Sequence, residues 1–556
     1  MKVVIVGGVA AGMSAATRLR RLNELAEITV YEMGEHVSYA NCGLPYFVSG
    51  VIADREKLLL QTPESIKNRF NVNVLTRHRV DSIDPERRVV NVTNLSNGIT
   101  FQDSYDHLVL ATGAKPRVPN LPGAERGLVL RDVHDLDQLV QNLESKKPVS
   151  AAVIGGGFIG IELAENLARL GIQVSIIQKG KSLMGTFDLE MVEPLHEHLE
   201  KNDVRLHLGA EISEIRDTDV LLSDGTLVAG ESVFFAAGVE PDVTLALRAG
   251  LKLADHGGIL VDKDQRTSQP EIFAAGDAAA KRSLFDSSDE LLPLANLANR
   301  HGRLIADAIM GVPTHARESS GTAILSAFGL AIAKTGLSEK QAISKGLDIG
   351  VVHLHPFSHA TYYPGAERLA LKVIFDRHSG KLLGAQATGQ DGVDKRIDVI
   401  STAIYAGLEI NDLMNLELAY APQFGSAKDA VNQAGFVGNN LIEGKTPNLQ
   451  WHELESFMSG DGLLIDVRTR SERDAGYIEG SVNIPLDELR SQVNTLTGKS
   501  VVVHCQVGQR GHTAVRLLRE SGIQAKNLDG GFITWKAGTD ASRRKKEKNN
   551  VFKSQL

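Results

Sequence analysis

Short apolar runs alternate with helix-compatible stretches in the first part of the chain. The run KVVIVGG (2–8) ends in glycines, the stretch 10–22 is rich in small residues, and EITVYEM (27–33) is apolar again. Because strands buried on both faces of a parallel sheet are short apolar runs, this order predicts strand, glycine turn, helix and strand. The same pattern returns after Pro148 in SAAVIGGGFIGIELAENLARLGIQVSIIQKG, so the architecture repeats within the chain.

Further segments pair an apolar strand with a glycine, at 105–117, 231–242 and 270–279. From about residue 321 the pattern changes: KVIFD and KLLGAQATG are typical of antiparallel strands, and 394–414 has apolar residues at helical spacing. The polar segment 437–448 is interpreted as a linker. Beyond it, apolar runs and helical segments alternate over about 90 residues, which predicts a small separate α/β domain.

Composition narrows the function classes. The formal net charge of −8 gives no reason to expect nucleic acid as a partner. Two cysteines in 556 residues exclude a disulfide scaffold and favour a cytoplasmic location. No apolar run reaches about 18 residues, so no membrane span is expected, and the N-terminal apolar run is interpreted as a buried strand rather than a signal peptide. The basic end is interpreted as a solvated, frayed terminus: Arg543, Arg544, Lys545 and Lys546.

The first glycine loop follows the first predicted strand. Glycines at this place let the backbone approach a pyrophosphate at the N-terminus of the next helix. Glu32 ends the second strand, where a carboxylate can accept from ribose hydroxyls. The loop alone also fits a tight turn in a fold that binds no nucleotide. Its residues are Gly7, Gly8, Ala10, Ala11 and Gly12.

The second loop matches GxGxxG in full and also follows a strand. Two such loops suggest two dinucleotides, most simply FAD and a nicotinamide cofactor. Gln178 and Lys179 end the next strand, where an acid favours NADH and a cation tolerates NADPH, so the choice stays open and NADPH is expected to be tolerated. The loop residues are Gly155, Gly157, Phe158, Ile159 and Gly160.

Residues 1 to about 440 resemble the two-dinucleotide-domain flavoprotein disulfide reductases. The carrying motifs are the two loops, Ala111-Thr112-Gly113 and Ala275-Gly276-Asp277. The resemblance implies that Asp277 holds the flavin ribityl chain, that a helix starting near Pro293-Leu294-Ala295 points its N-terminus at the flavin, and that Phe158 covers the flavin. Further cofactor positions implied are Met33, Val80, Gly113, Gly276 and Gly238.

Cys42 lies in SYANCG (38–43), and a lone cysteine is commonly a small core residue. The motif resembles the single-cysteine branch of the same family. There, a helix start and the flavin would lower the pKa of the thiol and make it a nucleophile. A single thiol needs an outside sulfur or oxygen, as in NADH peroxidases and oxidases, coenzyme A-disulfide reductases and persulfide reductases. Ala10 stands where the peroxidase and oxidase branch has His, which argues against peroxide chemistry.

NCGLPYFVSG and the segments 359–376 and 394–429 resemble coenzyme A-disulfide reductases. In that branch two tyrosines from the partner subunit reach the active-site sulfur, and Tyr362 and Tyr420 match them, which implies a homodimer. Ordinary interface aromatics are the alternative, and Tyr363 competes with Tyr362. Six residues match coenzyme A contacts of that branch: Ser14, Arg18, Arg21, Ser38, Asn41 and Lys428. The first three lie on one face of a predicted helix, and this face also fits a solvated basic surface.

The C-terminal unit resembles a rhodanese, through the segments 464–486 and 528–538 and the loop CQVGQR (505–510). The resemblance implies a catalytic Cys505 whose thiolate or persulfide is stabilised by successive loop N–H groups, with Arg510 adding positive charge. Two distant cysteines and scattered histidines form no metal-ligand pattern, so no metal is expected.

The resemblances imply an α/β chain with two Rossmann-like dinucleotide-binding domains, an α+β dimerisation domain and a C-terminal rhodanese-like domain. The expected boundaries are 1–112 with 245–320 for FAD, 113–244 for NAD(P)H, 321–440 for dimerisation, 441–450 for a linker, 451–540 for the rhodanese and 541–556 for a basic tail.

The implied function is FAD- and NAD(P)H-dependent reduction of persulfides or polysulfides, with coenzyme A persulfide as the expected substrate and sulfide as product. Coenzyme A is a substrate or a bound carrier in this interpretation. The alternatives are a coenzyme A-disulfide reductase in thiol redox balance, and a sulfur carrier or redox-regulated sulfurtransferase. An NADH peroxidase or oxidase is disfavoured by Ala10.

Overall fold

The computed structural model describes the backbone of residues 1–553 and the side chains of residues 1–544. The chain divides into two compact units, which are residues 1–177 with 211–320, and residues 178–210 with 321–556. Parallel and antiparallel sheets with helices packed on them make up both units, which confirms the predicted α/β class. Within the described residues, no helix is both long and apolar enough to cross a membrane.

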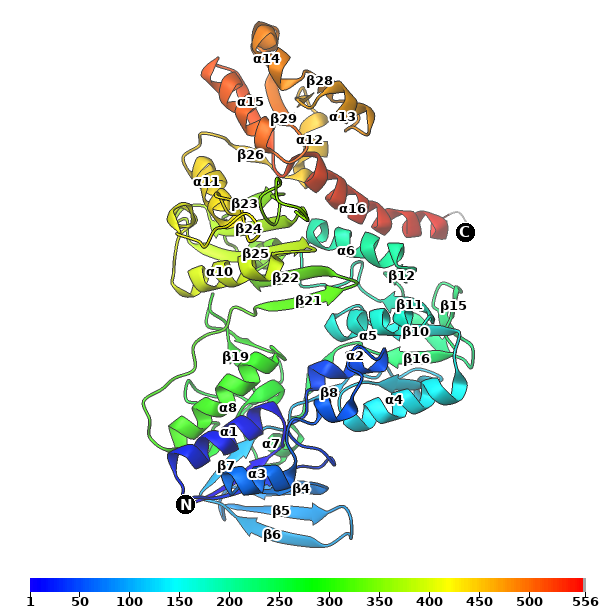
Figure 1. Ribbon diagram of the computed structural model, residues 1–556, viewed down its shortest axis with the longest axis vertical. Coiled ribbons are helices and arrows are strands. Elements are labelled where there is room, and N and C mark those ends of the chain that lie inside the picture. The colour runs from blue at the N-terminus through cyan, green and yellow to red at the C-terminus, as the bar shows by residue number, and fades with distance from the viewer. Residues whose placement is uncertain (554–556) are drawn as a thin grey trace. The chain divides into compact units, whose positions relative to one another are not determined.

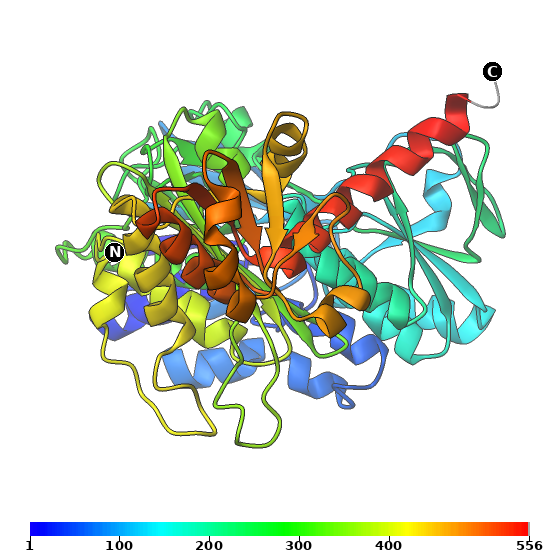
Figure 2. The same cartoon turned by 90° about the horizontal axis from the view of Figure 1, so that it is seen from above.

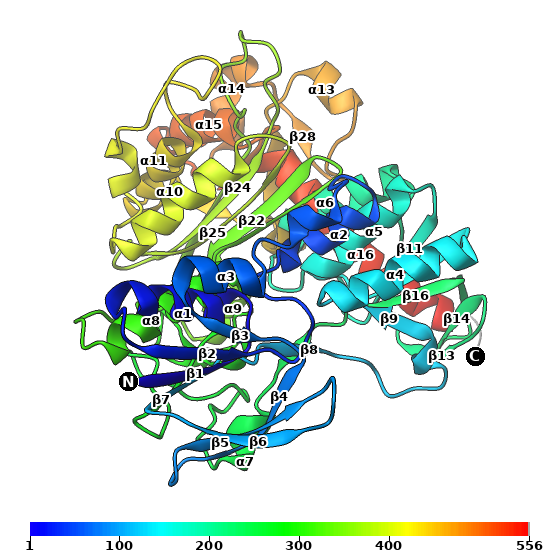
Figure 3. The ribbon, with the colours of Figure 1, turned by 60° about the horizontal axis from the view of Figure 1, so that its bottom comes forward.

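The first unit is built on a parallel sheet of order β18-β7-β1-β2-β3, with β1 (Lys2–Val6) at its centre. Helices α1 (Ala10–Leu22) and α8 (Ala295–Ile309) lie side by side on it, as Figures 1 and 3 show. They can approach closely because a Cβ on Gly302 would lie only 2.1 Å from the Ala11 carbonyl oxygen. The other strands are β18 (Ile272–Ala274), β7 (His107–Leu110), β2 (Glu27–Tyr31) and β3 (Asn73–Leu75).

The second copy of the predicted pattern forms another parallel sheet, in the order β11-β10-β16-β9. Helix α5 (Phe158–Arg169) follows β10, as α1 follows β1, and this confirms the repeat. The strands are β11 (Gln173–Gln178), β10 (Ser150–Ile154), β16 (Ser232–Phe235) and β9 (Gly127–Val129). Smaller elements of the unit are β4 (His78–Asp84), β5 (Val89–Asn94), β6 (Thr100–Ser104), α2 (Leu44–Val48), α3 (Pro63–Phe70), α4 (Val133–Lys146) and α7 (Thr244–Arg248).

The second unit contains an antiparallel sheet of order β21-β22-β25-β24-β23, with α10 (Val393–Tyr405) and α11 (Ala430–Ile442) packed nearby (Figure 3). This confirms the predicted change to antiparallel strands. Helices α6 (Leu189–Lys201) and α9 (Glu339–Ser344) also belong to this unit. The strands are β21 (Ala323–Ala327), β22 (Leu330–Gly336), β25 (Leu382–Gly389), β24 (Ala370–Asp376) and β23 (Ile349–Leu354).

A separate parallel sheet, β26-β30-β29-β27-β28, forms the C-terminal part of the same unit. Helix α16 (Gly531–Lys553), red in Figure 2, starts directly after β30 and extends away from the sheet. The strands are β26 (Asn448–Leu449), β30 (Gln524–Leu528), β29 (Ser500–His504), β27 (Leu463–Asp466) and β28 (Val482–Asn483). The other helices are α12 (Leu454–Met458), α13 (Arg470–Asp474), α14 (Leu486–Gln492) and α15 (Gln509–Glu520).

Three predictions of local structure are wrong. The helix expected over 394–414 ends at Tyr405, because Gly407 adopts a φ of +71°. The expected linker from 437 is still α11 as far as Ile442, and its glycines serve close packing, since a Cβ on Gly438 would lie 2.2 Å from Ile410 Cγ1. The prediction of a frayed terminus is wrong for Arg544, which lies in α16 and pairs with Glu200. The side chains of Lys545 and Lys546 lie outside the described residues.

Candidate functional site

The two glycine loops have the same geometry. Gly7 has a φ of +103°, and a Cβ there would lie 2.2 Å from the Ala111 carbonyl oxygen, while a Cβ on Gly12 would lie 1.9 Å from the Gly7 oxygen. In the second loop Gly155 has a φ of +114°, and a Cβ on Gly160 would lie 2.0 Å from its carbonyl oxygen. Both loops are thus pressed between a neighbouring strand end and a helix start, as a pyrophosphate cradle requires.

Glu32 directly follows β2 and lies beside the first loop, as expected of a ribose acceptor. Its two carboxylate oxygens accept from the Gly8 and Gly34 backbone N–H groups, at 2.7 Å each. A carboxylate has lone pairs for further donors, so these bonds fix its orientation without using up its capacity. Of the other expected cofactor positions near this strand, Val80 is buried in β4 and Met33 is exposed. The chain's own residues therefore fit a dinucleotide at this loop.

Asp277 follows β18 in a short 3-10 turn, and α8 starts at Ala295, directly after Pro293 and Leu294 as predicted. Burial raises the pKa of Asp277, while Lys281 and Arg131 oppose the rise. Lys281 is itself buried and donates to the carbonyl oxygens of Gly276 and Ala279, and burial lowers its pKa to about 8. Lys281 is a site residue that was not predicted from the sequence, and its position shortly after the AGD motif is the available signal.

Cys42 lies in a 3-10 turn (Asn41–Gly43) directly before the short helix α2. Its sulfur lies 3.8 Å from Asn41 Oδ1, and the Ser38 N–H donates to the Gly8 carbonyl oxygen at 2.8 Å. The thiol-bearing segment is thus joined to the first glycine loop. Of the predicted coenzyme A contacts, Ser38 and Asn41 therefore flank the thiol.

The groups that the chain itself supplies act against the lowered thiol pKa that is predicted from a helix start and the flavin together. The residue is exposed overall, yet desolvation around the thiol, followed by repulsion from Glu162 and Asp277, raises the pKa of Cys42. Helix α2 has only five residues and so provides a weak dipole to oppose this.

Glu162 is a site residue that sequence reasoning missed. Tyr46 Oη donates to its Oε1 at 3.2 Å, and Ser49 Oγ donates to Asn166 Oδ1 at 2.5 Å, so α2 is bonded along α5. Burial raises the pKa of Glu162 to about 7. The available signal was its place one helical turn after Phe158, on the helix that follows the second glycine loop.

In the second unit, Tyr362 and Tyr420 are brought together, with their hydroxyl oxygens 2.9 Å apart. Both side chains are exposed. Tyr363 instead packs edge-on against His359 of its own loop, with ring centroids 5.8 Å apart. The hydroxyl pair favours Tyr362 over Tyr363 for the predicted role.

Buried Arg396 of α10 holds the loops that carry the two tyrosines. Its guanidinium donates to the Ser358 carbonyl oxygen and to Asp429 Oδ2, at 2.8 Å each. Lys395 Nζ adds a contact to Asp429 Oδ2 at 3.6 Å. The exposed tyrosine pair thus rests on a buried charged support.

The remaining predicted coenzyme A contacts are spread over the chain. In α1, Arg18 pairs with Asp307 at 2.7 Å and Ser14 Oγ donates to Asn299 Oδ1 at 2.7 Å, so both bind α8, whereas Arg21 is exposed. Lys428 is exposed in the second unit, next to Asp429. Arg18 therefore has an internal partner that a phosphate would have to share, and the coenzyme A contacts remain predictions.

Cys505 follows β29 and is fully buried, and the loop ends at Gly508, with a φ of +89°, before α15. A Cβ on Gly531 would lie 2.6 Å from the Cys505 carbonyl oxygen, so the start of α16 packs directly against the backbone of the loop. Arg510 forms a two-bond ion pair with Glu472, at 2.6 and 2.8 Å. Glu472, and to a smaller extent Cys505, raise the pKa of Arg510, which places its charge near the sulfur as predicted.

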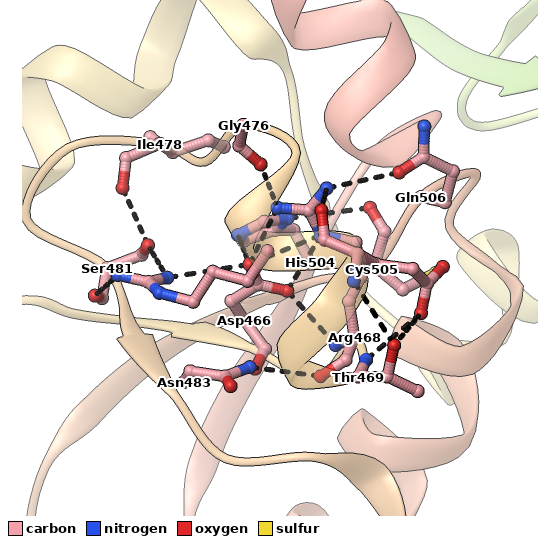
Figure 4. A network of polar contacts seen from close by, with 12 residues as sticks. Asp466, Arg468, Thr469, Gly476, Ile478, Ser481, Asn483, His504, Cys505 and Gln506 are labelled. Atoms are coloured by element: carbon pink, nitrogen blue, oxygen red, sulfur yellow. Dashed lines mark hydrogen bonds and ion pairs between the residues drawn. The ribbon is translucent and has the colours of Figure 1, made fainter.

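A buried polar network surrounds the Cys505 loop (Figure 4). Arg468 pairs with Asp466 at 2.8 Å, donates to Gln506 Oε1 at 3.1 Å and lies over the Phe532 ring at 4.4 Å. Burial lowers the pKa of His504 to about 4, so this neighbour of Cys505 is neutral. Arg468 thus fixes one side of the loop, and it also donates to the carbonyl oxygen of Glu472, the residue that pairs with Arg510.

One carboxylate cluster has the spacing of a metal site, namely Asp188, Glu190 and Glu339. Lys372 Nζ lies among the three, at 3.0, 2.6 and 2.6 Å from their oxygens. Lys372 is fully buried. Its ammonium is the cation of this cluster.

Known protein families match three successive segments of the chain. Residues 1–302 match the family described as pyridine nucleotide-disulphide oxidoreductase, residues 323–431 match the dimerisation domain of that family, and residues 450–538 match the rhodanese-like domain.

Named relatives agree with these matches. A coenzyme A disulfide reductase of Staphylococcus epidermidis is 32% identical over 78% of this chain and 99% of its own. A solved structure of reduced Bacillus anthracis CoADR-RHD is 42% identical, with a TM-score of 0.95, covering 97% of this chain and 98% of that one. The structure of an NAD-dependent persulfide reductase from A. fulgidus is 34% identical, with a TM-score of 0.90, covering 96% and 100%.

Proposed function

Because the chain belongs to the pyridine nucleotide-disulphide oxidoreductase family, we propose that it is an FAD- and NAD(P)H-dependent reductase of persulfides or polysulfides that releases sulfide. One observation carries the proposal. The chain has two thiols, and one lies beside the first dinucleotide loop while the other lies in a rhodanese-like loop. Such a pair suits an enzyme that both carries sulfane sulfur and reduces it.

The reaction consumes one persulfide and two electrons: RSSH, NAD(P)H and a proton give RSH, hydrogen sulfide and NAD(P)⁺. Bound FAD would supply the two electrons from NAD(P)H. The Cys42 thiolate attacks the outer sulfur of the persulfide, which forms a new S–S bond on Cys42 and releases RS⁻ to take up a proton. Reduction of that bond returns the Cys42 thiolate and releases HS⁻. Attack on the inner sulfur would instead release HS⁻ first and leave a mixed disulfide on Cys42.

Other side chains take supporting roles in this proposal. Burial raises the pKa of Glu162 to about 7, so near neutral pH its carboxyl group can take up a proton and give it to a leaving thiolate. The hydroxyl pair Tyr362–Tyr420 serves the same purpose from a partner subunit, in a homodimer that the dimerisation-domain match supports. Cys505 accepts or delivers sulfane sulfur, with Arg510 stabilising the anionic sulfur.

Coenzyme A persulfide is the proposed substrate, because the relatives named above include a coenzyme A disulfide reductase. The same similarity favours a second function, reduction of coenzyme A disulfide itself. A sulfur-carrier role with a regulatory flavin half is a third.

The deciding experiment is anaerobic NADH oxidation by the pure protein, with coenzyme A persulfide or polysulfide against coenzyme A disulfide at equal concentration. Faster turnover with stoichiometric sulfide supports the persulfide reductase. Faster turnover of the disulfide favours the second function, and slow turnover with all three favours the carrier. Cys42→Ser is the matched control and should abolish NADH oxidation with every substrate.

A further inference from the structure

A histidine of the antiparallel sheet is buried between two carboxylates in the second unit. His353 of β23 has its Nε2 3.1 Å from Glu190 Oε1 and its Nδ1 2.7 Å from Asp529 Oδ2. All three residues are at most 5% exposed. A carboxylate only accepts hydrogen bonds, so a ring with a carboxylate at each nitrogen donates from both and is an imidazolium.

Asp529 connects this imidazolium to the Cys505 loop. Asp529 is the first residue after β30, and its Oδ2 also accepts a hydrogen bond from the His353 backbone N–H at 3.0 Å. The next residues, Gly530 and Gly531, have φ of +64° and +66°. A Cβ on Gly530 would lie 2.8 Å from His353 Cβ, and one on Gly531 would lie 2.6 Å from the Cys505 carbonyl oxygen. Two adjacent glycines thus touch the histidine on one side and the loop on the other.

Main-chain hydrogen bonds complete the link. Phe532 N donates to the Cys505 carbonyl oxygen at 2.8 Å, and Ile533 N donates to the Gln506 carbonyl oxygen at 3.1 Å. The position of the first turn of α16 therefore determines the position of the loop that buries Cys505.

We propose that His353 is a positioning residue for Cys505: as a cation it fixes Asp529, and thereby the glycine pair on which the loop 505–510 rests. The rhodanese-like site is then completed by a side chain from outside the rhodanese-like domain. The inference concerns closure of the loop and rests on the proposed function only for its effect on sulfur transfer.

The groups around His353 determine how its charge responds to pH. Burial lowers the pKa of His353, but the hydrogen bonds that its ring donates to Asp529 and Glu190 outweigh burial and raise this pKa to about 9. Lys372 of β24 bonds Glu190, and its pKa is raised further, so it keeps its charge beyond that pH. His355 donates or accepts at Thr534 Oγ1, and burial lowers its pKa to about 3.

Three more groups complete this environment. Asp188 and Glu339 both pair with Lys372. His452 Nε2 lies 3.3 Å from Glu339 Oε1, and its hydrogen bond with Glu339 raises the pKa of His452. Because the folded pKa of His353 is raised, its stabilising charge is complete below its ordinary pKa near 6.5 and is lost as the pH rises through about 9.

The test uses the two cysteines as separate reporters in the full-length protein. Iodoacetamide labels Cys42 and Cys505 in one sample, and peptide mass spectrometry gives each rate. His353→Gln should raise the Cys505 rate near neutral pH by roughly tenfold, the effect of losing one charge-assisted hydrogen bond. The Cys42 rate should stay unchanged. The ratio of variant to wild-type Cys505 rates should fall towards one above about pH 9, where wild-type His353 is neutral as well.

Arg544→Gln is the matched control, because it removes the ion pairs with Glu193 and Glu200, which do not involve Asp529. It should change the Cys505 rate by less than about twofold. If His353→Gln raises the labelling rates of both cysteines, which would indicate misfolding, Asp529→Asn replaces it and should reproduce the Cys505 effect. An unchanged Cys505 rate in a folded variant, or a rate ratio that does not depend on pH, overturns the proposal. Labelling is measured without substrate, so a protein inactive in sulfur transfer would refute the function and leave this inference standing.

Discussion

Arg396→Met should loosen the loops that carry Tyr362 and Tyr420. The change leaves the Asp429 carboxylate, 4% exposed, without its two guanidinium bonds at 2.8 and 3.3 Å. Breaking a buried ion pair costs about 3–5 kcal/mol. Lys395 at 3.6 Å and the Val431 N–H at 3.1 Å remain as partners, so we expect the lower end, about 3 kcal/mol, or roughly a hundredfold in local opening.

Hydrogen exchange followed by mass spectrometry measures that opening directly. The amides to follow are those of Ser358 and Ala360, which donate to the Glu367 and Gly425 carbonyl oxygens. Adding Asp429→Leu to Arg396→Met removes the stranded charge and should recover all but about 1 kcal/mol, which is the lost helix cap of α11. Arg377→Gln is the control, because that arginine is half exposed. Unchanged exchange in the single variant, or a double variant as loose as the single one, would refute the reasoning.

Four further outcomes follow from the site. Gly12→Ala should abolish FAD retention, measured by flavin absorbance after gel filtration, because its Cβ would lie 1.9 Å from a carbonyl oxygen. Cys505→Ser should spare coenzyme A disulfide reduction but impair turnover of donors that need the rhodanese-like domain; equal rates with every donor would contradict coupling of the two thiols. Glu162→Gln should lower the pKa of Cys42, read from the pH dependence of its alkylation, since it removes a repelling carboxylate. Tyr362→Phe should lower kcat more than it raises KM, because the hydroxyl is proposed to act on the leaving thiolate.

Sequence patterns predicted the elements whose cause is local. The buried strands β1 and β10 are continuous apolar runs, and each is followed by glycines whose conformation a side chain would forbid. The wrong prediction of a linker from residue 437 has a cause that is not local. The glycines of α11 resemble those of a flexible segment, but they allow the helix to approach Ile410, a contact that no local pattern encodes.

The functional side chains also fall into two groups, those that stand in local motifs and those that depend on partners distant in the chain. Cys42 and Cys505 stand in recognisable motifs, whereas His353 gains its meaning only from carboxylates 163 and 176 positions away in the chain. Lys281 and Glu162 are similar cases, because their pKa values depend on burial. Burial and distant partners arise from the tertiary fold, so the pKa values of Lys281 and Glu162 and the carboxylate partners of His353 could not be derived from spacing.

The surroundings of the two thiols fit a division of labour. Around Cys42 the chain places Glu162 and Asp277, which oppose a thiolate, and so the groups that favour ionisation there have to arrive with the cofactor or substrate, or Glu162 has to take up a proton. Around Cys505 it places a closed loop that buries the sulfur, and the Arg510 guanidinium, which is paired with Glu472, lies close by. A thiol that becomes reactive on loading suits a reductive step, and a thiol enclosed by its own loop suits storage of sulfane sulfur. Under the proposed function, the order is therefore loading at Cys505 and reduction at Cys42.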